Sequence, residues 1–387
     1  MKLKLASIAV MSLFTCAASA QSSVTIYGML DAGILSISNS SNPAFGYLPN
    51  STNNGSVVGL KDGGMGQSFW GLRGSEDIGG GMKVNFNLRG NLSTQTGVAG
   101  GPNSSGGTSL FNQEANVGIS GDFGSIRAGR VIAPVYYAFA GTDVRNGAYF
   151  GSSLTGLVGL NSATGAFAGG NSNATISTIY NDNAIVYISP KMSGVTASFE
   201  YAFGEVAGNT SAGRQIVGTI TYDDPHLKLD AIYYSGNDNG IAASLSPQGN
   251  PTNRLMQVGA MYTFESLSLS AGYWKGDNPT FPGGGMNPAK LGGAATTGSL
   301  DMVNLGLGYR ISPQLNLTSG MYSIKDNNNM ANKSVLYVVG ADYSLSKSTK
   351  LYFEVANVNN QGSNMNQGPV YASPVTRSEE RRVGKEC

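Results

Sequence analysis

Residues 195–203 read VTASFEYAF, with an apolar or aromatic side chain at every second position. Successive side chains of a β-strand point to opposite sides, so Val195, Phe199 and Phe203 share one face while Glu200 lies on the other. This pattern predicts a strand with one apolar and one polar face. The same alternation recurs along most of the chain, which indicates an all-β protein.

The connections between the predicted strands alternate between short and long. The short turns include 76–81 and 223–226, and the long loops include 36–65 and 276–300. Short turns at one end and long loops at the other are typical of a transmembrane antiparallel β-barrel. A soluble β-sandwich also alternates, but we do not expect it to sort its connections so regularly. Fifteen strands are predicted near 23–35, 66–76, 82–92, 112–120, 124–130, 175–189, 195–203, 215–222, 227–235, 254–264, 267–275, 301–310, 315–325, 334–343 and 349–357.

A closed barrel also gives hydrogen-bond partners to the backbone of a chain that crosses lipid. Every N–H and C=O group in hydrocarbon needs an internal partner, so only helices and closed sheets can span a bilayer. After residue 20, no apolar run is long enough for a spanning helix. Because single-chain bacterial barrels have an even number of strands, we expect a sixteenth strand after the loop at 358–376.

The two ends of the chain differ from its body. Residues 1–20 have the positively charged start, apolar core and small-residue cleavage site of a secretory signal peptide. Residues 377–387 read RSEERRVGKEC and resemble the translation of a sequencing-adapter oligonucleotide, so we interpret them as a non-native tail. The expected barrel is therefore 21–376 without its last strand, with a gap beside the first strand and the tail outside the sheet.

Composition excludes several classes of function. Charged residues make up 12% of the chain and the body is close to neutral, so we expect no nucleic-acid surface. Both cysteines, Cys16 and Cys387, lie in the ends, which leaves the body without a disulfide or a thiolate metal site. The single histidine, His226, lies in a predicted turn without a nucleophile motif beside it. We expect no enzyme activity, no cofactor and no metal.

Three motifs resemble a known family. They are QSSVTIYGMLDAG at 21–33, GLRGSEDIG at 71–79 and LYFEVA at 351–356. They are similar to trimeric general porins of Gram-negative bacteria, of the β-proteobacterial type. The resemblance implies a sixteen-stranded barrel in the outer membrane lipid, a homotrimer, an inward-folded third loop and passive diffusion of ions and small hydrophilic solutes. It also implies an aromatic final residue, which Cys387 is not.

The segment 131–174 is the longest stretch of the body without strand alternation. It is rich in glycine, alanine, serine and asparagine. Because so long a loop in a compact protein is usually functional, we expect it to fold into the barrel and narrow the pore. The loop contains one acid that could face the pore, Asp143.

Four arginines are candidates for the constriction. Strand parity turns Arg73, Arg89 and Arg127 toward the lumen. Strict parity would turn Arg130 outward, but Gly129 can host a bend where the strand ends. The family's Gly-Arg motif implies that Arg130 lies in the constriction as well.

The resemblance is incomplete at the constriction. Positions that are basic in enterobacterial relatives match Met29, Phe69 and Asn181, and Arg89 stands where an acid is usual. The charge pattern of the expected constriction therefore differs from that of the enterobacterial relatives. Since a ring of arginines favours anions, we expect a modest anion preference.

The alternative to a channel is a surface adhesin or structural barrel with a plugged lumen. The inward faces of the predicted strands are polar or glycine, which suits water and argues against a plug. Single-channel conductance separates the two, because a plugged barrel conducts no ions. The residues alone do not name the solutes.

Overall fold

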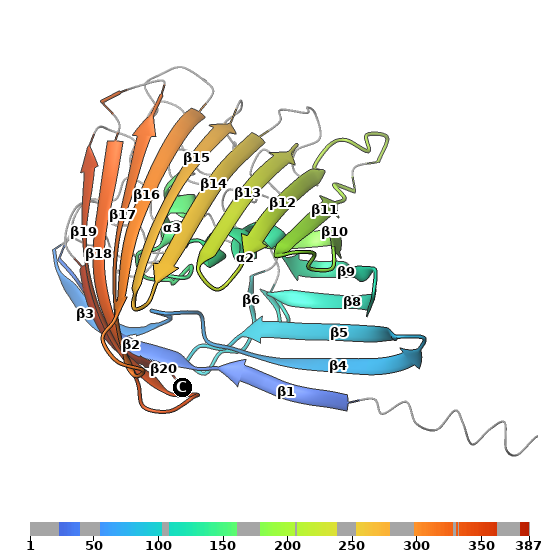
Figure 1. Cartoon of the computed structure of the whole chain (residues 1–387), viewed down its shortest axis with the longest axis horizontal. Coiled ribbons are helices and arrows are strands. Elements are labelled where there is room, and N and C mark those ends of the chain that lie inside the picture. Colours follow the sequence, from blue (N-terminus) through green and yellow to red (C-terminus); the bar gives the residue numbers. More distant parts are fainter. Residues whose placement is uncertain are drawn as a thin grey trace, which may run out of the picture.

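The structure is a computed structural model, and it describes residues 23–38, 55–102, 108–160, 179–205, 207–237, 253–278, 298–327, 330–331, 333–361 and 380–386. The expected signal peptide lies outside these residues. Antiparallel strands dominate the described chain, and two short helices, α2 (Pro134–Gly141) and α3 (Ser153–Leu160), follow β9 (Figure 1). Among the described residues, no helix is both long enough and apolar enough to cross a membrane.

One antiparallel sheet holds nearly all the strands, and a short pair of strands forms a second. The pair consists of β6 (Gly101–Pro102) and β7 (Thr108–Ser109). The large sheet consists of β1 (Ser23–Met29), β2 (Asp31–Ile37), β3 (Val57–Asp62), β4 (Phe69–Gly79), β5 (Met82–Asn91), β8 (Glu114–Gly121), β9 (Gly124–Ile132), β10 (Tyr180–Ile188), β11 (Val195–Ala202), β12 (Gln215–Asp223), β13 (Leu227–Gly236), β14 (Asn253–Phe264), β15 (Leu267–Asn278), β16 (Gly298–Arg310), β17 (Leu315–Asp326), β18 (Lys333–Ser344), β19 (Lys350–Gln361) and β20 (Glu380–Glu386).

Strand pairing follows the order of the chain around a ring. β1 and β2 are two parts of one strand interrupted at Leu30, and they pair with β4 and β3, respectively. β3 and β4 are likewise two parts of the strand that follows, so the eighteen segments of the sheet make sixteen strands in the described part of the chain. Fifteen of these precede residue 376 and overlap the predicted strands, but β3 lies inside the long loop predicted at 36–65, so that prediction is wrong for residues 57–62.

The C-terminal segment joins the sheet. β20 pairs along its whole length with β19 on one side and with β2 on the other. The expectation that residues 377–387 lie outside the sheet is therefore wrong. The backbone explains this result, because an exposed edge needs N–H and C=O partners and any main chain can supply them. Within the described residues, β1 still has one edge without a strand partner, since β20 reaches only β2.

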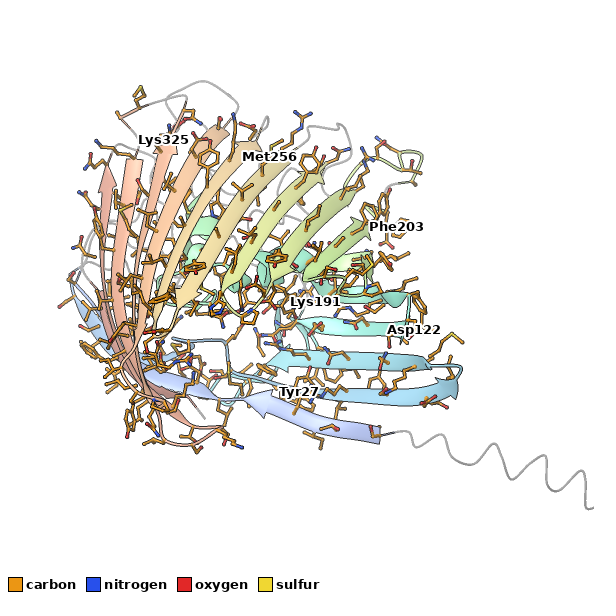
Figure 2. The ribbon with its side chains drawn as sticks, viewed as in Figure 1. Tyr27, Asp122, Lys191, Phe203, Met256 and Lys325 are labelled. Carbon is orange, nitrogen blue, oxygen red and sulfur yellow. The ribbon has the colours of Figure 1, made fainter. Side chains whose placement is uncertain are left out.

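The outer face of the barrel is apolar and exposed. On β16, Val303, Leu305 and Leu307 are 41%, 48% and 46% exposed, whereas Asn304 between them is 4% exposed. The same alternation on the other strands places side chains such as Met256 on the outer surface (Figure 2). An apolar band of this kind is the lipid-facing surface of a transmembrane barrel.

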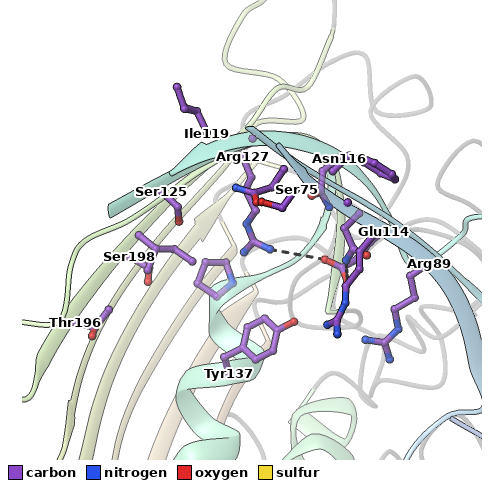
Figure 3. Close-up of a pocket in the computed structure, with 18 of the residues that line it drawn as sticks. Ser75, Arg89, Glu114, Asn116, Ile119, Ser125, Arg127, Tyr137, Thr196 and Ser198 are labelled. Atoms are coloured by element: carbon purple, nitrogen blue, oxygen red, sulfur yellow. Dashed lines mark hydrogen bonds and ion pairs between the residues drawn. The ribbon is translucent and has the colours of Figure 1, made fainter. Parts of the chain in front are cut away.

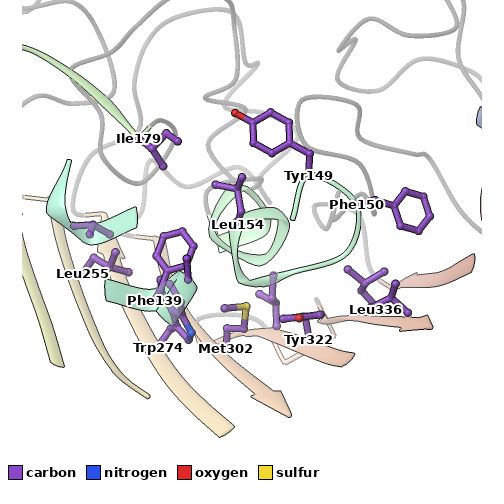
Figure 4. Packing of buried hydrophobic residues seen from close by; sticks show 14 of the residues in the cluster. Phe139, Tyr149, Phe150, Leu154, Ile179, Leu255, Trp274, Met302, Tyr322 and Leu336 are labelled. Atoms are coloured by element: carbon purple, nitrogen blue, oxygen red, sulfur yellow. The ribbon is translucent and has the colours of Figure 1, made fainter. Parts of the chain in front are cut away.

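The main hydrophobic core lies inside the barrel, between the loop and one wall. Phe139 of α2 and Leu154 of α3 belong to the same buried cluster as Trp274, Tyr322 and Leu336 on the wall (Figure 4). The rings of Phe139 and Trp274 lie 5.3 Å apart. The expectation that inward faces are polar or glycine throughout is therefore wrong for this wall, which carries the apolar side chains that bind the loop.

Candidate functional site

The segment after β9 folds into the barrel, as expected. The amide of Ala133 donates to the carbonyl of Ile179 at 2.8 Å, and α2 begins at Pro134 directly afterwards. Proline is tolerated there because the N–H groups of the first helical turn have no acceptor within the helix, so the N–H that proline lacks is not needed. α2 packs against β11, β12 and β13, and α3 packs against β16 and β17.

Arg145 clamps the loop to the far wall. Its guanidinium donates to the carbonyls of Gly151 at 2.6 Å and Phe150 at 2.7 Å, and to the hydroxyl of Thr318 on β17 at 2.7 Å. It also pairs with the carboxylate of Glu354 on β19. The side chains of Arg145 and Glu354 are only 3% and 1% exposed. This role of Arg145 was not predicted from the sequence.

Asp143 belongs to the same anchor and does not face the arginines. Its carboxylate accepts the amide of Ser153 at the start of α3 at 2.6 Å, and the hydroxyl of Tyr322 at 3.0 Å. It is 3% exposed. The prediction that Asp143 is the acid opposite the arginines is wrong, because a helix N-terminus and a wall tyrosine occupy both of its oxygens.

Inward glycines on the wall make room for the loop. A Cβ atom at Gly306 would lie 2.6 Å from the side chain of Val144, and one at Gly340 would lie 2.4 Å from the guanidinium of Arg145. Both glycines lie on the lumen face, where alternation predicts small or polar residues. The signal was therefore present in the sequence, but glycine alone does not say which side chain fills the space.

An open cavity of about 850 Å³ remains on the other side of the lumen. Strands β1, β4, β5 and β8 to β12 line it, and α2 closes one side through Pro134, Tyr137 and Ala138 (Figure 3). Most wall residues that line it are polar, such as Asn87, Ser125 and Thr196. We call this surface the polar arc. Water therefore has a path beside the docked loop.

Three of the four predicted arginines line the polar arc. Arg73 and Arg89 have no acid within ion-pairing distance in the described chain, and each lies over an aromatic ring. Arg127 lies 3.8 Å from the carboxylate of Glu114, which is itself almost buried. Glu114 was missed by the sequence analysis, although it lies at the start of a predicted strand.

Arg130 lies at the edge of the loop and does not line the cavity. Its guanidinium pairs with Asp182 on β10 and donates to the carbonyl of Asn112 at 2.6 Å. Gly129 has a φ of +129°, and the β10 register shifts between Asn181 and Ala184, so the expected bend is present. Asp182 therefore neutralises the arginine that the family motif places in the constriction.

A second inward segment supports the loop, and sequence analysis did not predict it. The carboxylate of Asp31 accepts the amides of Gly64 at 2.7 Å, Met65 at 2.9 Å and Gly66 at 3.0 Å. The amide of Phe150 in the loop donates to the carbonyl of Gly64 at 2.9 Å. The glycine-rich run after β3 was the available signal, since successive free amides form a nest for a carboxylate.

Two tyrosines of α2 add no charge to the polar arc at neutral pH. Burial raises the pKa of Tyr136 to about 12. Tyr137 is 51% exposed to the cavity, yet the enclosing barrel wall desolvates its hydroxyl and raises its pKa, and the nearby charge of Glu114 raises it further. Both hydroxyls therefore stay protonated, and the charge that a solute meets comes from the arginines, from Glu114 and from the pair Lys191–Asp223.

A ring of antiparallel strands with an apolar exterior, a polar inner arc and a loop folded inside defines a class of protein, the transmembrane diffusion channel. The sequence profile of the Gram-negative porin family matches residues 6–363, and the chain belongs to this family. It is an outer-membrane porin that forms a water-filled channel for passive diffusion, narrowed by the inward loop.

Relatives agree with this assignment over nearly the whole chain. The outer membrane porin protein 32 of Delftia acidovorans is 29% identical and covers 98% of this chain and 96% of its own length. An outer membrane porin protein of Bordetella pertussis is 26% identical over 91% of this chain and 93% of its own. The solved anion-selective porin from Comamonas acidovorans has a TM-score of 0.72 at 23% identity, covering 95% of this chain and 99% of that one.

Proposed function

We propose that the chain works as a homotrimeric porin whose pore prefers small anions to cations. One observation carries this proposal: Arg73 and Arg89 face the cavity, and neither has an acid within ion-pairing distance among the described residues. A pore lined by uncompensated arginines attracts anions and repels cations. Arg127 contributes less, because Glu114 lies beside it.

The loop adds no negative charge to the cavity. Its acid, Asp143, is buried against α3 and Tyr322 on the opposite side of the lumen. Among the described residues, four cations and two acids line the cavity, and Lys191 and Asp223 neutralise each other at 3.0 Å. The structural neighbour from Comamonas acidovorans is described as anion-selective, and a neighbour from Vibrio cholerae is described in a trimer form.

The chain transports solutes without chemical change in this proposal. His226 lies in the turn between β12 and β13, where its Nδ1 is 3.2 Å from the carbonyl of Thr263. Its amide donates to Asp224 in the same turn at 2.8 Å. The histidine therefore has a structural position at the rim, away from the polar arc that solutes cross.

Reversal potentials across planar bilayers in a KCl gradient test the anion preference. The wild type should give a potential of anion-selective sign, and the double variant R73Q/R89Q should move it toward zero. K325M serves as the control, because Lys325 is exposed and pairs with Asp301, and neither residue lines the cavity. Cation selectivity of the wild type, or an unchanged potential in R73Q/R89Q, would overturn the proposal.

A further inference from the structure

The two unpaired arginines belong to one cluster with two aromatic rings. On β4, Phe69, Gly71 and Arg73 share the inward face, since they are two residues apart. Gly71 pairs with Tyr27 on β1 and with Arg89 on β5. The four side chains therefore surround a single glycine. We call Tyr27, Phe69, Arg73 and Arg89 the aromatic–arginine cluster.

Gly71 leaves room for the rings of Tyr27 and Phe69 to meet across the strand. A Cβ atom at this position would lie 2.8 Å from the ring of Tyr27 and 2.5 Å from the carbonyl of Leu88. Without a side chain there, the ring of Tyr27 reaches that of Phe69, and the two meet edge to face with centroids 5.7 Å apart.

Each guanidinium is held against one ring. The Cζ atom of Arg89 lies 3.6 Å from the centroid of Phe69, and that of Arg73 lies 4.9 Å from the centroid of Tyr27. Both distances are within the range of attraction between a cation and an aromatic face. Arg73 and Arg89 line the cavity, whereas Phe69 lies behind them. The aromatic rings thus fix the orientation of two planar cations that face water.

The polar side chains beside the cluster hydrogen-bond to one another rather than to Arg73 and Arg89. The hydroxyl of Tyr27 donates to Asn87, and the amide of Asn87 donates to Glu114 at 2.8 Å. Glu114 lies beside Arg127. The Nε atom of Arg89 is buried and has no hydrogen-bond partner in the described part of the chain. The guanidinium of Arg89 therefore keeps hydrogen-bonding capacity that the described side chains around it do not use.

The geometry suits a planar anion. A guanidinium binds a carboxylate in its own plane through paired N–H donors, while its free face can stack on a second flat group. Tyr137 of α2 borders the same cavity on the loop side (Figure 3). We propose that the aromatic–arginine cluster is a subsite of the pore for small planar carboxylates, above all aromatic monocarboxylates. This inference rests on the proposed anion-preferring channel and names the class of solute that it favours.

Bi-ionic reversal potentials with sodium benzoate on one side and sodium cyclohexanecarboxylate on the other test the inference. The two anions have the same charge and nearly the same size, and only benzoate is flat. We expect the wild type to favour benzoate by about threefold or more, the size of one exposed cation–aromatic contact. F69L removes the ring behind Arg89, so its permeability ratio should fall toward one. F69Y keeps a ring there and should retain the preference.

The control F199L makes the same change on the outer face of β11, where Phe199 is exposed to lipid, and should leave the ratio at the wild-type value. Equal permeabilities of the two anions in the wild type would overturn the inference even if F69L failed to assemble. A KCl gradient measured on the same channels keeps the two claims apart. Anion preference in KCl with a benzoate ratio of one would overturn the subsite alone, whereas cation preference in KCl would overturn the proposed function.

Discussion

Replacement of Arg145 by methionine should release the loop from the wall. The substitution keeps most of the side-chain length but removes the charge and four interactions, with Gly151, Phe150, Thr318 and Glu354. Glu354 then remains at 1% exposure without its cation. Breaking a buried ion pair on one side costs about 3–5 kcal/mol, because the remaining charge is uncompensated.

That cost is large compared with the free energy that holds a loop in place. Since about 1.4 kcal/mol changes an equilibrium constant tenfold, about 3–5 kcal/mol shifts the docked loop toward the released loop by roughly a hundredfold or more. The apolar contacts of Phe139 and Leu154 remain and oppose complete release. We therefore expect a loop that fluctuates between docked and released positions.

Single-channel recording is the direct assay. R145M channels should show greater current noise and a higher mean conductance than the wild type. The double variant R145M/E354L removes both charges at similar volume, and such replacements are often neutral, so it should be quieter than R145M. The control K325M removes a cation whose side chain is 64% exposed and therefore screened by water, away from the loop clamp, and it should behave like the wild type. R145M channels with wild-type noise and conductance would refute the role of this clamp.

Two further predictions concern the charge of the polar arc and the open edge of β1 beside β20, which we call the seam. E114Q removes the acid 3.8 Å from Arg127, so the reversal potential in a KCl gradient should become more anion-selective; a shift toward cations would contradict the placement of this pair in the pore. A replacement of residues 377–387 by a longer alternating strand that ends in phenylalanine should pair β1 as well as β2 and raise the heat resistance of the assembled barrel on gels. Equal heat resistance of the two proteins would show that the seam does not limit stability.

The strands were predictable because their signal is local. A lipid-facing side chain alternates with a lumen-facing one, and this alternation is visible at Val303, Asn304 and Leu305 without any knowledge of the partners. The parity rule also placed Arg73, Arg89 and Arg127 correctly on the inner face. Backbone pairing, in contrast, accepts any sequence, which is why the charged segment 380–386 forms a strand against expectation.

The loop was not predictable in detail because its partners are distant in sequence. Helix α2 reads PVYYAFAG, whose aromatic residues favour strands, and only the proline at its start marks a helix. Asp143 and Arg145 lie in a loop segment without strand alternation. Their partners, Tyr322 and Glu354, lie more than a hundred residues further along the chain. Sequence spacing gives no signal for such contacts. It also gives none for the pairing of Arg130 with Asp182 across a bulge.

Cysteine accessibility tests most directly whether solutes pass along the polar arc while the loop covers the opposite wall. Ser198 lines the cavity, whereas Ser270, also on the inner face, is 6% exposed beneath Val144, whose amide donates to it at 3.4 Å. In a C387S background, a charged methanethiosulfonate reagent should reduce the current through S198C channels and leave S270C channels unchanged. A rapid block of S270C channels, with S198C channels unaffected, would contradict this path.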